Sequence, residues 1–416
     1  MFLNSYHQSK NKEIYVLALL ILFSIVIRIP VILMYGDTSL EHEWEILVNN
    51  LIKHGKLVYE TFDDGFLLPN LVMPPLYAYY LYCFSFFNLE DQNYILLILS
   101  SQLLLASISV AVFYKINEFF FSRKVSFYSS LLFSIIPLHV YACGQISAIS
   151  LHIFLMILFF YLFFKLTKKN FFPLIVLFSF LSGLLILLRG EFRIIFVISI
   201  LYLFIFFKMP VKKILLIFLI TLVTASPYLI RNFIIFDKIT IVETSGYNLW
   251  KGNHPLAVKN SLVEGLDFSP GRDIKLSEQI DAIPRDKFYR INRDNFFFRQ
   301  AVKNIMEKPL EHLIFSLKKA ISFQFINYDS MDRRYWNPLH YLPLLLLGIT
   351  SLIGLVLCDK KSHKFNYLIF IFFLNIVIFS FFFILPRYKL AILPLQIIFT
   401  NVLIGYINKK LFSKHD

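Results

Sequence analysis

Long runs of uncharged apolar residues recur along almost the whole sequence, and they restrict the fold more than any other feature. Each run is roughly 17–25 residues long, the length that a helix needs to cross a bilayer. Hydrophobic residues make up 57% of the 416 positions, whereas soluble domains are roughly 45–50% apolar. In lipid the backbone must pair its polar groups internally. The sequence therefore predicts an all-α polytopic membrane protein.

Ten of the runs are predicted to span the membrane. Placing the N-terminus in the cytoplasm puts at least two basic residues in every cytoplasmic turn and none in the short external turn 144–147, as the positive-inside rule requires. Both termini are then cytoplasmic, and we predict a bacterial inner-membrane protein with its active site on the periplasmic side. The predicted spans are residues 14–35, 93–116, 125–142, 148–166, 171–188, 192–207, 213–231, 340–357, 365–384 and 388–407.

One further apolar run, residues 71–88, is predicted not to span. Counting it as a span would move the basic turns outside, and the Pro74–Pro75 pair opposes a continuous helix. We expect a re-entrant or juxtamembrane helix on the outer face, following an external first loop at 36–70.

The second external segment covers about a hundred residues, and a loop of that length is usually functional or a domain of its own. We expect helix near 294–322 and a β-like stretch at 236–244. The predicted organisation is a transmembrane module at 1–231, a large periplasmic loop at 232–338 and C-terminal transmembrane helices at 339–416. The net charge of +14 is explained by the cytoplasmic basic turns, so we predict no nucleic-acid partner.

Carboxylates gather directly after the first span. Asp37, Glu41 and Glu45 are four residues apart, so a helix would place them on one face, with Glu43 on another. A solvated acidic helix would explain this pattern. The functional alternative is a general base, or a carboxylate that binds metal, at the membrane surface.

Cations are predicted at the same outer face. Arg189 interrupts an apolar run, and Arg387 and Lys389 lie in a short external turn. They could extend toward lipid headgroups or bind a phosphate. A carboxylate that deprotonates an acceptor hydroxyl, beside cations that stabilise a departing phosphate, suits glycosyl transfer from a lipid-phosphate sugar.

Four segments resemble the GT-C superfamily of membrane glycosyltransferases, and bacterial protein O-mannosyltransferases and aminoarabinose transferases in particular. They appear in the family's order from the first span to the last. The segments are EWEILVNNLIKHG, MPPLYAYYLY, SPYLIRNFIIFDKITIVETSGYNLWKGNHP and LPRYKLAILPLQIIF.

The resemblance implies a GT-C-like helix bundle, a polyprenyl-phosphate-linked sugar donor, inversion at the anomeric carbon and a first-loop carboxylate as base. Alignment favours Glu41, with Asp37 and Glu43 as rivals. The transferred sugar is a hexose or pentose, and the acceptor is a lipid, glycan or protein. A divalent metal is left open. The acidic residue that many relatives have at the start of the fourth span is absent here. The substrate-binding residues assigned on this basis are Arg387, Lys389, Arg189, Lys251, His254 and Tyr77.

Two other functions fit a polytopic chain with a long external loop. An O-antigen polymerase or ligase would depend on loop arginine and histidine rather than on carboxylates after the first span. A lipid-linked sugar flippase would show internal repeats with broken helices, and the sequence contains no such repeat.

Overall fold

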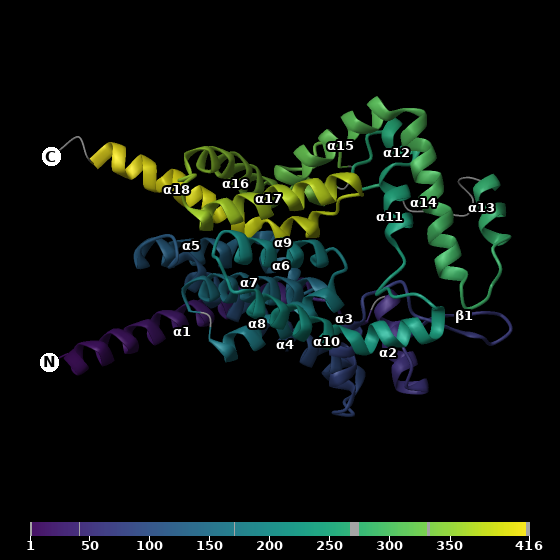
Figure 1. Cartoon of the computed structure of the whole chain (residues 1–416), viewed down its shortest axis with the longest axis horizontal. Helices are drawn as coiled ribbons and strands as arrows, with labels where there is room; N and C mark the ends of the chain where they lie inside the picture. Colours follow the sequence, from purple (N-terminus) through teal and green to yellow (C-terminus); the bar gives the residue numbers. More distant parts are fainter. Residues whose placement is uncertain (1, 41, 170, 267–273, 331–332, 413–416) are drawn as a thin grey trace.

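The computed structural model describes residues 2–40, 42–169, 171–266, 274–330 and 333–412, and helices dominate these ranges (Figure 1). The prediction of an all-α polytopic membrane protein is confirmed, whereas the count of ten spans stays a prediction. Six helices are long and apolar enough to cross a membrane: α1 (Phe2–Tyr35), α4 (Asp91–Asn117), α7 (Ala148–Lys168), α10 (Val211–Phe236), α16 (Pro338–Leu357) and α17 (His363–Phe381). Two shorter apolar helices are α8 (Phe172–Leu188) and α9 (Phe192–Ile205).

The two remaining predicted spans are interrupted. The run 125–142 divides into α5 (Arg123–Ile135) and α6 (Pro137–Ala142), because Pro137 lacks the N–H that would continue the helix. The run 388–407 begins with a 3₁₀ helix, η2 (Pro386–Ala391), and continues as α18 (Leu393–Phe412). Such breaks require protein neighbours to pair the released backbone groups.

The first loop folds into a compact unit against the bundle. It contains α2 (His42–His54), an antiparallel pair formed by β1 (Val58–Thr61) and β2 (Leu67–Pro69), and α3 (Pro75–Ser85). The eleven residues of α3 reach about 16 Å, too short for a hydrocarbon core of about 30 Å. This length agrees with a juxtamembrane helix.

One prediction for the first loop is wrong. Asp37 and Glu45 do not share a helix face, because α1 ends at Tyr35 and α2 begins at His42. Asp37 lies in the connection between them, where hydrogen bonds to the 144–146 turn hold it. Glu41 lies outside the described residues.

The long loop is helical and has a small core of its own, formed by Trp250, Leu276, Ile280, Phe297 and Ala301. The helix expected near 294–322 is confirmed as two helices separated at Lys308, directly before Pro309. The helices of the loop are α11 (Ser245–Gly252), α12 (Pro255–Lys259), α13 (Ile274–Asp281), α14 (Tyr289–Glu307), α15 (Pro309–Gln324) and the 3₁₀ helix η1 (Arg333–Trp336).

The β-like stretch at 236–244 is not a strand. Helix α10 continues to Phe236, and Asp237 ends it in the left-handed conformation. The backbone of the segment that follows makes isolated hydrogen bonds instead of a ladder. The Thr240 carbonyl accepts from the Asn232 side-chain amide, and the Glu243 N–H donates to the Leu71 carbonyl. Among the described residues no strand pairs with this segment.

Helices distant in sequence pack side by side within the bundle: α1 with α4, α4 with α7, α8 with α10, and α16 with α18. Arg28, two turns before the end of α1, is fully buried. Its guanidinium donates to the Ser134 carbonyl at 3.1 Å and to His139 Nδ1 at 2.9 Å. This buried cation therefore fastens α1 to the break between α5 and α6, and its hydrogen bonds offset the cost of the charge.

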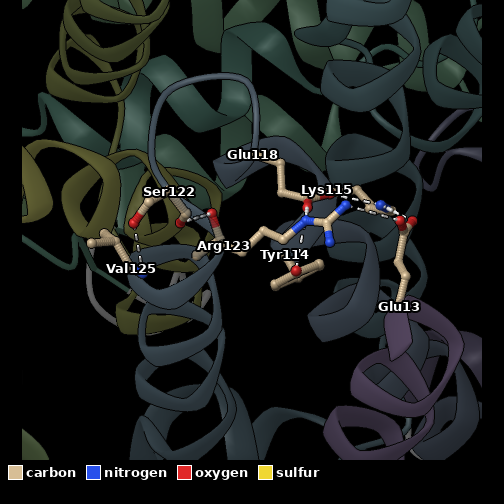
Figure 2. Close-up of polar contacts among 8 residues, drawn as sticks. Glu13, Tyr114, Lys115, Glu118, Ser122, Arg123 and Val125 are labelled. Atoms are coloured by element: carbon tan, nitrogen blue, oxygen red, sulfur yellow. Dashed lines mark hydrogen bonds and ion pairs between the residues drawn. The ribbon is translucent and has the colours of Figure 1, made fainter. Parts of the chain in front are cut away.

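An ion-pair network connects α1, α4 and α5 away from the loops (Figure 2). Lys115 bridges Glu13 and Glu118, and Arg123 reaches both carboxylates, at 3.8 Å and 3.5 Å. The network neutralises one of the basic turns that the sequence places in the cytoplasm.

The two ends of the bundle differ in character (Figure 1). Helices α1 and α18 extend from one end, so the first and last described residues lie there. The first-loop unit and helices α11–α15 gather at the opposite end. We call this the loop-bearing end, and any site formed by both loops must lie there.

The contact between α16 and α18 depends on a glycine. A Cβ atom at Gly354 would lie 1.8 Å from the Phe399 carbonyl oxygen, whereas a Cβ atom at Gly405 would meet nothing within 4 Å. We expect Gly354→Ala to force the helices apart and to lower stability by about 1–3 kcal/mol, measured as a lower Tm in detergent. Gly405→Ala, also in a helix, should keep or raise the Tm. Equal melting temperatures for the two variants would contradict this close contact.

Candidate active site at the loop-bearing end

Asp37 is held firmly where α1 ends. Its N–H donates to the Gly144 carbonyl at 2.9 Å, and its Oδ2 accepts from the Ile146 N–H at 2.6 Å. These partners form the turn between α6 and α7. The chain passes into this position through Gly36, where a Cβ atom would lie 2.4 Å from the Ile32 carbonyl oxygen. The first-loop carboxylate is therefore anchored to the transmembrane helices rather than displayed on a mobile loop.

A chain of hydrogen bonds supports the same turn from the other side. Gln145 donates to the Tyr35 carbonyl at 3.0 Å, Gln102 donates to the Gln145 carbonyl at 3.0 Å, and the Tyr77 hydroxyl donates to Gln102 at 2.9 Å. Burial, followed by nearby charges that include Asp37, raises the pKa of Tyr77 well above its usual value. Tyr77 therefore remains a hydrogen-bond donor. It is fully buried, so its place is in the support of Asp37 and not on an open surface.

The other first-loop carboxylates lie toward the long loop. Glu43 is on α2, and its charge contributes, after burial, to the raised pKa of Tyr59. The guanidinium of Arg290, on α14, lies 5.0 Å from the Tyr59 ring centre and pairs with Glu60. The two loops are thus joined by charge at this point, with Glu43 close to the junction.

The 3₁₀ helix η2 brings the predicted cations to the helices that anchor Asp37, because it packs against both α6 and α7. The guanidinium of Arg189 lies 5.6 Å from the Tyr388 ring centre, and that of Arg387 lies 5.9 Å from the same ring. Arg189 also faces Glu191 at 3.7 Å. Two cations far apart in sequence therefore meet at one aromatic ring. Lys389 is different, since only 4% of it is exposed.

The Lys251–His254 segment joins this group from the long loop. The Lys251 ammonium lies 4.6 Å from the Phe383 ring centre, and Phe383 contacts Tyr388 with ring centres 6.0 Å apart. Gly252 permits the approach, because a Cβ atom there would lie 2.4 Å from the Phe382 backbone. His254 caps α12 by accepting a hydrogen bond from the Leu256 N–H. Lys251 thus lies near the arginine pair, whereas the His254 ring turns toward Trp250 and its own helix.

Two residues that hold this segment were not predicted from the sequence. The buried ammonium of Lys319, on α15, donates to the Gly252 carbonyl at 3.0 Å. Asn253 donates to the carbonyls of Leu249 and Phe381, each at 2.8 Å. Lys319 follows Phe315 by four residues and precedes Ser322 by three, on the buried face of α15. That spacing is the signal that could have identified it.

Trp44 and Trp250 are 7% and 3% exposed, so neither presents a ring face for a sugar to stack on. Among the residues that the structure describes, no three His, Cys, Asp or Glu side chains lie close enough together to hold a metal ion. We derive no catalytic step through a metal.

The chemistry available is therefore a carboxylate fixed to the turn between α6 and α7, and two arginines beside Tyr388 of η2, which packs against the same two helices. Asp37 carries a carboxylate, a group that can accept a proton when it is ionised. The arginine pair can bind a phosphate through several N–H donors.

No protein-family model matches the chain, and no curated protein matches it. Solved structures of the oligosaccharyltransferase from Archaeoglobus fulgidus are similar in fold. The structure tethered to an acceptor peptide matches 97% of this chain and 50% of that chain, with a TM-score of 0.58 and 13% identity. The apo form matches 97% and 51%, with a TM-score of 0.56 and 11% identity. This chain spans about half the length of these structures. At these identities the likeness is one of fold.

Lys319 generates a prediction about pH. Burial lowers its pKa from 10.5 to about 7, so between these values the unfolded chain binds more protons than the folded chain. The free energy of unfolding should therefore rise as pH rises from about 7 toward 10.5. Lys319→Met should flatten the slope of Tm against pH, measured in detergent. Lys303→Met, at a side chain that is 68% exposed, should keep the slope of the wild type. An unchanged slope in Lys319→Met would contradict the lowered pKa of Lys319.

Proposed function

We propose that this protein is a GT-C-type glycosyltransferase that moves a sugar from a polyprenyl-phosphate carrier to an acceptor hydroxyl at the periplasmic face of a bacterial inner membrane. One observation carries the proposal: Asp37 is bonded to the turn between α6 and α7, and η2, whose Tyr388 lies beside Arg189 and Arg387, packs against the same two helices. The fold shared with an oligosaccharyltransferase supports the same class of reaction.

The reaction needs one base and one site for the leaving group. The carboxylate takes the proton of the acceptor hydroxyl while its oxygen attacks the anomeric carbon from the face opposite the phosphate. The new carbon–oxygen bond forms as the bond to the carrier phosphate breaks, so the anomeric configuration inverts. The released phosphate stays on its lipid carrier, and the arginine pair stabilises the charge that develops on it.

The base is one of the first-loop carboxylates. Asp37 has the strongest structural support, because its backbone and side chain are both fixed to the turn between α6 and α7. Alignment of the family motif favours Glu41 instead, and Glu43 lies toward the junction with α14. A comparison of the three amide variants separates them.

A groove suitable for the carrier's tail lies between α9 and α17. It is apolar, about 530 Å³ in volume, and lined by Ile198, Leu201, Tyr202, Ile205, Phe206, Asn366, Ile369, Phe370 and Phe373. Ile198, at the end of the groove nearest to Arg189 in sequence, lies six residues, about 9 Å, along α9 from Phe192, and Arg189 comes three residues before Phe192. Helix α17 leads from the other wall toward Arg387. A phosphate between the arginines would thus allow its hydrocarbon chain to descend into the groove.

The first test is a transfer assay in liposomes. It uses a panel of radiolabelled polyprenyl-phosphate hexoses and pentoses, with a membrane extract as acceptor. We expect Asp37→Asn to lower kcat by about 10²- to 10⁴-fold, the usual contribution of a general base. Arg387→Ala should also lose most transfer.

Each outcome of this assay points to one conclusion. If Glu41→Gln or Glu43→Gln abolishes transfer while Asp37→Asn does not, the base moves to that glutamate and the class of enzyme stands. If the wild type transfers none of the lipid-linked sugars while a control enzyme does, the proposed function is wrong. The polymerase and flippase alternatives then come first.

The groove predicts a dependence on chain length. We expect Leu201→Trp to fill the groove and to lower kcat/KM about 10-fold for donors with long polyprenyl chains. Donors whose chains are too short to reach the groove at Ile198 should change little. Leu215→Trp, at a position on α10 that is 61% exposed, is the control. Equal losses with long and short donors would show that the groove does not hold the tail.

A further inference from the structure

A small cavity with a mostly apolar lining and a few polar residues lies beside η2. Its volume is about 20 Å³. It is enclosed by four segments: the 263–264 turn, the end of α15 with the residues after it, the start of α16 with η1, and η2 itself. The polar residues that line it are Glu264, Ser322, Asn327, Tyr335 and Lys389.

The walls of the cavity are fixed by hydrogen bonds. The Ile384 N–H donates to the Val263 carbonyl at 3.1 Å, which holds the 263–264 turn against the approach to η2. The Asn327 N–H donates to the Tyr335 hydroxyl at 2.5 Å, and its side chain donates to Glu264 at 3.1 Å. The carboxylate of Glu264 is thus oriented from one side and still has lone pairs to offer.

Lys389 supplies the opposite wall. It is 4% exposed, and its ammonium is buried without a hydrogen-bond partner among the described residues. A buried ammonium without a partner costs free energy, so such a group in a native structure points to a partner that binds it. Arg387, two residues earlier, is exposed. In a 3₁₀ helix residues two apart face different sides, so η2 presents Arg387 to the phosphate site and Lys389 to the cavity.

The charges and the volume define the group that fits. An anion would be repelled by Glu264, and a cation would be repelled by Lys389. A hydroxyl suits both, because it donates to the carboxylate and accepts from the ammonium. A water or hydroxyl needs roughly 10–15 Å³ in this measure, so the cavity has room for one such group and none for a phosphate with four oxygens.

We infer that the cavity formed by Glu264, Asn327 and Lys389 receives one hydroxyl group of the sugar that is transferred, and that it selects donors by that hydroxyl. The inference rests on the proposed function and changes the role of Lys389 from a phosphate contact to a sugar contact. Leu385 and Pro386, which directly precede Arg387, also line the cavity. A sugar bonded to a phosphate at Arg387 is therefore next to the cavity.

The experiment combines changes in the donor with changes in the protein. The donor that wild type uses in liposomes is compared with its monodeoxy analogues, each lacking a single ring hydroxyl. We expect one analogue to lose about 10- to 100-fold in kcat/KM, the worth of a hydrogen bond to a charged group. Lys389→Met and Glu264→Gln should each remove that preference, so that parent and analogue react equally. The other analogues should keep their ratios to the parent.

The controls are Lys303→Met and Glu307→Gln, a lysine and a glutamate on α14 whose side chains are 68% and 61% exposed. Both should keep the preference of the wild type. Glu264→Gln retains an oxygen for Asn327 and tests the inference even if Lys389→Met does not fold, which its Tm reports.

Four results would overturn the inference. The wild type could react with every monodeoxy donor as well as with the parent. The preference could persist in both variants, which would place recognition elsewhere. Both variants could lose activity equally with all donors, as expected of a cavity that holds only water. Failure of the wild type to use any lipid-linked sugar would overturn the proposed function, and this inference with it. The first three results leave the proposed function standing.

Discussion

In the hydrocarbon of a bilayer no water is present to pair with the backbone, and every other feature of this structure follows from that constraint. Most of the chain must be helical, and each interruption must lie where protein supplies hydrogen bonds. The interruptions found here obey this rule. The break at Pro137 lies beside Arg28, whose guanidinium bonds to the Ser134 carbonyl, and the break at η2 is surrounded by α6, α7 and α15. Irregular backbone is therefore concentrated around the candidate site.

The same constraint explains why charge gathers at two levels. At the end where the termini lie, Glu13 and Glu118 neutralise Lys115 and Arg123 (Figure 2). At the loop-bearing end the compensation is incomplete. Arg189 has Glu191 at 3.7 Å, but the ammonium of Lys389 has no partner in the described part of the chain. That ammonium lies in the cavity that it shares with Glu264, so the exposed guanidinium of Arg387 is the cation available to an anionic ligand such as a lipid-linked phosphate.

In the first loop, residue spacing alone did not predict the local structure. The spacing of Asp37, Glu41 and Glu45 favoured a single helix, yet α2 begins only at His42. What overrides the spacing is a pair of long-range hydrogen bonds between Asp37 and the 144–146 turn, one donated by the Asp37 N–H and one accepted by its carboxylate; local sequence does not encode them. The β-like stretch after α10 failed for a related reason. Its residues suit a strand, but a strand requires a neighbour, and none of the described segments lies beside it.

The sequence by itself determined the class of fold, most helix positions, the short helix after the first loop and the residue types at the loop-bearing end, because hydropathy and charge act locally along the chain. The tertiary structure decided which of these residues meet. It brought Arg189 and Arg387 to one tyrosine and turned Lys389 away from them into a cavity with Glu264. It also revealed Lys319 beneath the Lys251–His254 segment. These outcomes depend on how the helices pack and on which residues pair the backbone groups at the helix breaks. Such contacts join residues distant in sequence, so no periodic pattern along the chain predicts them.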